Sequence, residues 1–141
     1  MDPRDFLKTI YLHDRGCTGL LIDCERDRVS LQIDLISRIR SSSGDWEFDS
    51  DEDIDKGLIT FTGVESLRIT PGPLPNDYIY DFTVEPLPIA ENGGNGIPRY
   101  IFRMETGSVN RKGDFHGVTI EVVAAGVHLQ DPARPGLEIH E

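Results

Sequence analysis

Residues 29–35 alternate strictly between apolar and polar side chains, which is the pattern of a β-strand with one buried face. The segment reads Val-Ser-Leu-Gln-Ile-Asp-Leu. Because successive side chains of a strand point to opposite faces of the sheet, one face of this strand is expected in the core and the other in water. Alternating runs recur at 78–84 and 99–105. In the first of these, one face carries Tyr78, Tyr80, Phe82 and Val84 and is expected to point inward. The chain is therefore predicted to be mainly β.

One short helix is predicted before the strands. Asp2 followed by Pro3 is typical of a helix start, because the aspartate caps free backbone N–H groups and proline suits the first helical position. The polar stretch 25–28 has the length of a hairpin turn. The end of the chain carries two prolines and charged residues and is expected to fray. The predicted elements are a helix at 3–10, strands at 19–24, 29–36, 58–70, 78–84, 99–105 and 117–130, an acidic loop at 45–57, a flexible loop at 86–98 and a tail at 131–141.

Two glycines interrupt strand-like sequence at similar places. Gly63 lies within 58–70 and Gly126 within 117–130. Glycine inside a strand favours a bend, which lets a sheet curl or lets the chain pass from one layer to another. We therefore expect 141 residues to form a single domain with an antiparallel curled sheet, closed either as a sandwich or as a partly open barrel.

The charge of the chain limits its partners. It has 25 acidic and 14 basic side chains and a formal net charge of -11. Nucleic acid is a poor partner for such a chain, whereas a basic protein is a suitable one. The N-terminus lacks the apolar core of a secretory signal, and no apolar run approaches the ~20 residues that span a bilayer. A cytoplasmic location without membrane contact is expected, with Cys17 and Cys24 as reduced thiols.

The acidic segment 45–57 is the strongest candidate for function. Its aspartates alternate like the first ligands of a calcium-binding loop, but Ile54 stands where that loop needs glycine and Thr60 where it needs glutamate. No metal is therefore predicted. Aromatic side chains among charges resemble interface hot spots, although a solvated acidic loop is the simpler interpretation. The predicted partner-binding residues are Trp46, Phe48, Asp49, Asp51, Glu52, Asp53 and Asp55.

Catalytic residues are not predicted. His13 directly precedes Asp14, but the chain has no nucleophile motif that such a pair could activate, so a structural turn is expected there. His116, His128 and His140 are scattered without the spacing of a zinc site. We therefore predict a protein that is not an enzyme and has no cofactor.

Several short motifs resemble the start of a family of small uncharacterised bacterial β-domains. They are Tyr11-Leu12-His13-Asp14, the strand with Ile22-Asp23, the alternating run Val29 to Asp34, and Leu58 to Val64 after an acidic stretch. Some domains of this kind accompany polymorphic toxins and are taken to be immunity proteins. The resemblance implies binding of a protein and no enzymatic activity.

Three functions remain open at this level. The leading one is an immunity-type domain whose acidic surface at 45–55 binds a basic protein such as a toxin. A structural module that associates with itself through an exposed strand edge is the second. The third is a small-ligand site in the mouth of the curled sheet, lined by Tyr78, Tyr80 and Tyr100. The identity of the partner and the oligomeric state are not predicted.

Overall fold

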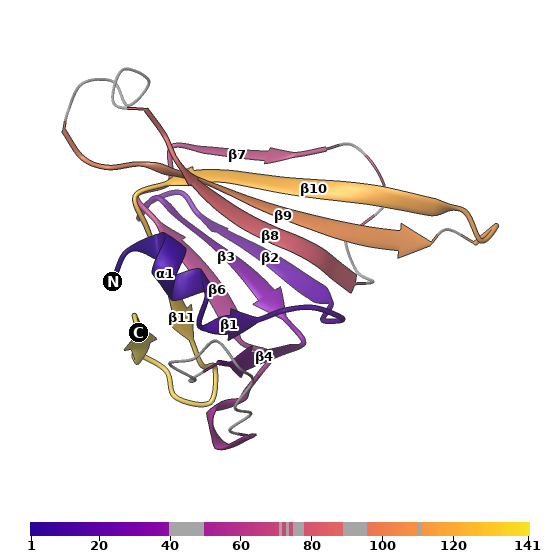
Figure 1. Ribbon diagram of the computed structural model, residues 1–141, viewed down its shortest axis with the longest axis horizontal. Helices are drawn as coiled ribbons and strands as arrows, with labels where there is room; N and C mark the ends of the chain where they lie inside the picture. The colour runs from indigo at the N-terminus through magenta and orange to yellow at the C-terminus, as the bar shows by residue number, and fades with distance from the viewer. Residues whose placement is uncertain (40–49, 71, 73, 75–77, 89–95, 110) are drawn as a thin grey trace.

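The computed structural model describes residues 1–39, 50–70, 72, 74, 78–88, 96–109 and 111–141. These residues form a mainly β, antiparallel fold in which two larger sheets face one another in a sandwich-like arrangement, as Figure 1 shows. A small third sheet lies at one end. The predicted fold class is confirmed, and the sandwich is the alternative that the structure supports.

Each sheet combines strands that are distant in the sequence. The five-stranded sheet has the order β12 (Glu138–Ile139), β11 (Gly126–Gln130), β6 (Leu58–Thr62), β3 (Arg28–Ile33) and β2 (Cys17–Asp23). The four-stranded sheet has the order β7 (Ser66–Ile69), β10 (Phe115–Ala124), β9 (Tyr100–Val109) and β8 (Tyr78–Pro86). The small sheet consists of β1 (Ile10–Tyr11), β4 (Leu35–Arg38) and β5 (Ile54–Asp55), and the helices are α1 (Pro3–Leu7) and the 3-10 turn η1 (Ser50–Glu52).

The helix α1 starts as predicted and ends earlier than predicted. Asp2 caps it, because one carboxylate oxygen accepts the backbone N–H of Arg4 at 2.8 Å. The helix ends at Leu7, since Ile10 already pairs with Arg38 in the β1–β4 ladder. None of the helices formed by the described residues has the length and apolar character that crossing a bilayer requires.

The chain crosses between the two large sheets at the two predicted glycine bends. Gly63 has a φ of 60° and joins β6 of one sheet to β7 of the other. The return crossing runs from Ala124 to Gly126, and there the backbone N–H of Ala125 donates to the carbonyl of Thr62 at 2.9 Å. The two crossings therefore lie side by side. The predicted strands 58–70 and 117–130 are each a pair of strands, one in each sheet.

The predicted strand 29–36 is broken at Asp34. Its carboxylate accepts the backbone N–H of Gly16 at 3.1 Å and that of Leu35 at 2.8 Å. These bonds turn the chain out of β3 and into β4, which belongs to the small sheet. An exposed aspartate is also common on the solvent-exposed face of a strand. The alternation of apolar and polar residues alone therefore could not reveal the break.

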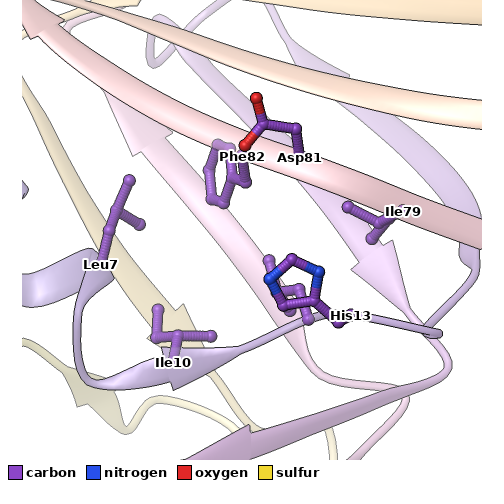
Figure 2. Close-up of a pocket in the computed structure, with 7 residues that line it drawn as sticks. Leu7, Ile10, His13, Ile79, Asp81 and Phe82 are labelled. Carbon is purple, nitrogen blue, oxygen red and sulfur yellow. The ribbon is translucent and has the colours of Figure 1, made fainter. Parts of the chain in front are cut away.

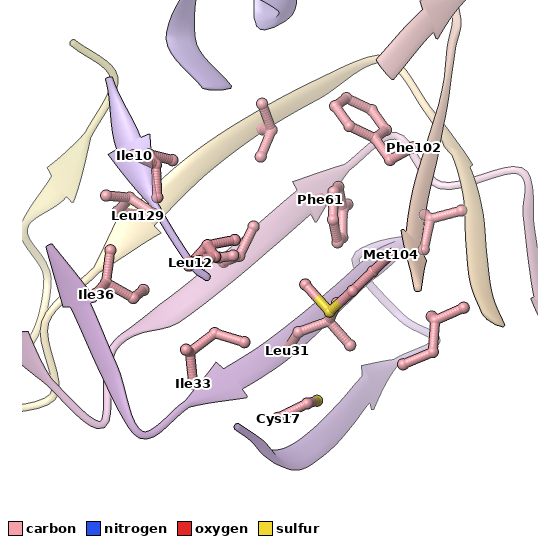
Figure 3. Close-up of a cluster of buried hydrophobic side chains, with 14 of the residues drawn as sticks. Ile10, Leu12, Cys17, Leu31, Ile33, Ile36, Phe61, Phe102, Met104 and Leu129 are labelled. Carbon is pink, nitrogen blue, oxygen red and sulfur yellow. The ribbon is translucent and has the colours of Figure 1, made fainter. Parts of the chain in front are cut away.

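The core lies between the two large sheets, as Figure 3 shows. Leu31 and Phe61 come from the five-stranded sheet, and Phe102 and Met104 from the four-stranded sheet, and all four are at most 1% exposed. The rings of Phe61 and Phe102 lie 4.8 Å apart between centroids. Apolar burial of this kind is the main force that holds the two sheets together.

The aromatic face predicted for residues 78–84 is not inward along its whole length. A bulge between Ile79 and Asp81 shifts the register of β8 against β9. Ile79 is therefore buried and Phe82 packs against the core, whereas Tyr78 and Tyr80 are exposed. The prediction that both tyrosines face inward is wrong, because one extra residue in a strand reverses the faces before it.

The tail does not fray as expected. Within it, β12 pairs with β11, and Leu129 lies opposite Ile139. Arg38, a buried side chain, donates from Nη2 to the hydroxyl of Thr9 at 3.1 Å and to the carbonyl of Glu141. Arg38 thus connects Glu141 to the segment between α1 and β1.

Candidate binding surface

Strand β2 presents three consecutive aliphatic side chains to solvent. It is the last strand on its side of the five-stranded sheet, so its outer edge pairs with no strand among the described residues. Leu20, Leu21 and Ile22 are 38%, 54% and 57% exposed. Single exposed aliphatic residues are ordinary, but adjacent ones on a free strand edge are typical of an interaction site.

Two of these side chains lie on the core side of the sheet. Leu20 lies opposite Leu31, and Ile22 lies opposite Val29, and both partners are buried. Ile69 of β7 similarly lies opposite the buried Ile120 but is 42% exposed. The apolar layer between the sheets therefore reaches solvent at the β2 and β7 edges. We call Leu20, Leu21, Ile22 and Ile69 the open edge.

A hollow of about 220 Å³ lies beside the open edge. Ile22 and Val29 line it from the β2–β3 hairpin, and Val64 and Leu67 line it from the chain that enters β7. Its rim carries charge from both sides. The charged residues that line it are Asp23, Asp27, Arg28 and Glu65.

The hairpin that carries the open edge is held by its own hydrogen bonds. Asp23 accepts the backbone N–H groups of Glu25 and Arg26, both at 3.2 Å, and pairs with the guanidinium of Arg26 at 3.0 Å. The hydrogen bond from Arg26 lowers the pKa of Asp23. The backbone N–H of Val64 donates to the carbonyl of Asp27 at 2.9 Å, which ties the hairpin tip to the crossing into β7.

The predicted acidic surface is only partly within the described residues. Trp46, Phe48 and Asp49 lie outside them. Asp51 and Asp55 are exposed, whereas Glu52 and Asp53 are partly buried beside the small sheet. The described part of this surface is thus acidic, and its aromatic part stays a prediction.

His13 and Asp14 lie in a turn closed by the bond from the N–H of Arg15 to the carbonyl of Leu12 at 3.1 Å, and Asp14 has a φ of 61°. Figure 2 shows His13 facing Asp81 and Phe82 across a hollow. The hollow has a volume of about 90 Å³. Pockets for drug-sized ligands are roughly 300 to 1,000 Å³, so this hollow suits no such ligand.

The three tyrosines expected around a ligand mouth are not gathered there. Tyr78 and Tyr80 lie on the outer surface with ring centroids 6.4 Å apart, and Phe115 lies beside Tyr78 at the same distance. Tyr100 begins β9, pairs with Ala124 and packs against the core. The bulge in β8 and the length of β9 separate Tyr78 and Tyr80 from Tyr100.

Sequence reasoning missed two groups of residues. The run Gly-Leu-Leu-Ile at 19–22 breaks the alternation that its partner strand keeps, and this break was a usable sign of the open edge. The second group is His128, Glu138 and His140, whose potential metal-ligand atoms all lie within 4.8 Å of one another. A predicted hairpin between residues 126–130 and 138–140 would have brought these three side chains together. The tail was instead expected to fray, so no such hairpin was predicted.

Comparison with known proteins identified a family and nothing more specific. The family model described as "Family of unknown function (DUF6258)" matches residues 1–141. The comparisons with curated proteins and with solved structures found no match.

Proposed function

We propose that this chain, which belongs along its whole length to the family of unknown function DUF6258, is a non-enzymatic domain that binds a basic protein at the open edge. The observation that carries the proposal is the exposure of Leu20, Leu21 and Ile22 along an unpaired strand. Burying aliphatic surface against a partner would remove it from water and so favour binding.

Strand addition is the mode of binding that this edge fits. Natural edge strands usually avoid pairing with other chains through lysines, prolines or bulges at the edge. From Leu20 to Ile22, strand β2 has no charge and no proline. An extended segment of a partner could therefore pair with the backbone of β2, and its alternate side chains could contact Leu20 and Ile22 on one face.

The charge of the chain favours a basic partner over a second copy. At a net charge of -11, two copies repel one another, whereas a basic protein is attracted before contact. Asp27 and Glu65 place acidic groups on the rim of the hollow beside the open edge. A toxin that degrades nucleic acid, whose active surface must be basic, is the partner class that the resemblance to immunity-type domains implies. Self-association through the same edge is the competing outcome.

A differential capture experiment tests this proposal. The full chain is immobilised as wild type, Ile22→Lys and Val109→Lys, and each is exposed to a lysate of its source cells. Val109 is a matched control, because it is 53% exposed and lies at the far end of β9. The expected result is a basic protein that wild type and Val109→Lys retain, that Ile22→Lys loses, and that leaves at high salt.

Other outcomes of the same experiment would refute the proposal. If all three versions retain the same proteins, or if the protein lost by Ile22→Lys is acidic, the open edge is not a site for a basic partner. Analytical sedimentation of the purified chain measures its oligomeric state and so tests self-association, which is the alternative function. A dimer that Ile22→Lys dissociates and Val109→Lys leaves intact would assign the open edge to self-association.

A further inference from the structure

Two histidines and a glutamate meet on the outer face of the five-stranded sheet, away from the core. The Nε2 atom of His128 lies 3.7 Å from one carboxylate oxygen of Glu138, and the Nε2 atom of His140 lies 3.2 Å from the other. The two imidazole rings lie 5.1 Å apart between centroids. All three potential ligand atoms lie within 4.8 Å of one another.

The register of β11 and β12 produces this cluster. Gln130 lies opposite Glu138 and Leu129 opposite Ile139, so the same register places His140 opposite His128. Glu138 and His140 are two residues apart and share one face of the extended chain. Strand β12 and the residue that follows it therefore supply two groups, and β11 supplies the third.

His128 is the unusual member of the cluster. It is 1% exposed, and its Nε2 atom is buried with no hydrogen-bond partner. A buried polar atom without a partner is destabilising, so native structures rarely keep one without a reason.

The distances fit a tetrahedral ion after a small adjustment. In a tetrahedral zinc site with bonds of about 2.0 to 2.1 Å, ligand atoms lie about 3.3 Å from one another. The observed separations are 3.7 Å from His128 Nε2 to one oxygen of Glu138 and 3.2 Å from His140 Nε2 to the other, and with one oxygen as ligand the three atoms lie within 4.8 Å of one another. The side chain of His140 is exposed, so its ring can rotate to bring the three ligand atoms closer together.

Arg28 places a positive charge beside Glu138, which opposes the binding of a cation there. Its Nη1 atom lies 3.5 Å from the same oxygen of Glu138 that faces His128. Both side chains of this pair are more than a third exposed, and exposed ion pairs are weak because water screens them. A carboxylate has about four acceptor positions on its two oxygens, so it can serve a metal ion and a guanidinium together.

We propose that His128, Glu138 and His140 form a binding site for a divalent transition-metal ion of the zinc type, with water at the fourth position. Imidazole nitrogen and carboxylate oxygen are ligands that zinc accepts, and the ion would give Nε2 of His128 the partner it lacks. Because the ligands come from β11, from β12 and from the residue after β12, the ion would also hold β12 against the sheet.

The test uses the full chain, purified without a polyhistidine tag and stripped with a chelator. Zn²⁺ is titrated by calorimetry, Co²⁺ is added as a spectroscopic probe, and the melting temperature is measured with and without Zn²⁺. We expect one equivalent of Zn²⁺ to bind, tetrahedral Co²⁺ bands to appear, and the melting temperature to rise, since a ligand that binds only the folded state stabilises it.

Three variants make the test specific. Glu138→Gln and His140→Ala change exposed side chains, so both are expected to fold, and each should weaken binding by about tenfold or more. His13→Ala removes an exposed histidine from outside the cluster and should bind as wild type does. The proposal is overturned if no stoichiometric binding occurs, if both cluster variants bind as wild type does, or if His13→Ala weakens binding equally.

Discussion

Ile22 and Val29 lie directly opposite one another in the β2–β3 ladder, yet Ile22 is 57% exposed and Val29 is 3% exposed. Directly opposite residues share one face of a sheet, so both side chains point to the core side. The core therefore ends between these two residues. Under the proposed function, a partner at the open edge would cover a continuation of the apolar layer that holds the sheets together.

The position of this boundary predicts unequal costs for two similar substitutions. Leu31→Ala removes a side chain that is 1% exposed and should lower the free energy of unfolding by about 2 to 5 kcal/mol. Leu20→Ala, on the opposite residue of the ladder, should cost about 1 kcal/mol or less, because its side chain is already in contact with water. Urea unfolding of both variants measures the difference, and equal costs would mean that the open edge is covered in the isolated chain.

The close approach of the two crossings predicts that a side chain at position 63 destabilises the fold. The φ of Gly63 is 60°, and a Cβ atom there would lie 2.9 Å from the Cβ atom of Ala125 in the neighbouring crossing. Gly136 is a matched control, since its φ is 86° but nothing lies within 4 Å of an added Cβ. Gly63→Ala should therefore lower stability by about 1 to 2 kcal/mol more than Gly136→Ala. Similar losses for the two variants would show that the crossings are not in close contact.

The two cysteines should differ in reactivity. Both are free thiols, but Cys17 is buried and Cys24 is exposed. Burial raises the pKa of the Cys17 thiol, which disfavours the reactive thiolate. In the native chain a thiol reagent should therefore modify Cys24 rapidly and Cys17 only on unfolding, as mass spectrometry of the labelled peptides can measure. Rapid labelling of Cys17 in the native chain would contradict the packing of β2 at its start.

The cap of α1 predicts an unusually acidic carboxyl group. The hydrogen bonds from the side chain and backbone of Arg4 lower the pKa of Asp2 from 3.8 to about 2. Because the folded pKa lies below the unfolded one, the stabilisation is fully present above about pH 4 and is lost as the pH falls through about 2. A carbon-detected NMR titration of Asp2 should give a midpoint near 2. A midpoint near 3.8 would mean that the cap is not formed.

Local sequence predicted the parts of the fold that depend on local chemistry. The start of α1 follows from Asp2 and Pro3, and the two layer crossings follow from glycines within strand-like sequence. The bulge before Asp81 and the break at Asp34 escaped prediction, because both residues suit the wet face of a regular strand.

The candidate sites depend on contacts that no local pattern records. The exposure of Ile22 is decided by where the opposite sheet ends, and the sequence of β2 contains no information on that length. The meeting of His128 and His140 is decided by the register of two strands separated by a turn with two prolines. The predicted residues Trp46, Phe48 and Asp49 lie outside the described part of the chain, so their role stays a prediction.

Hydrogen–deuterium exchange of the complex tests the central claim most directly. The wild-type chain is measured alone and with the basic protein that it retains and Ile22→Lys does not. The account predicts that the amides of β2, residues 17–23, become protected on binding, because an added strand would pair with their free edge. Protection confined to other segments, such as 50–55, with unchanged exchange in β2 would contradict it.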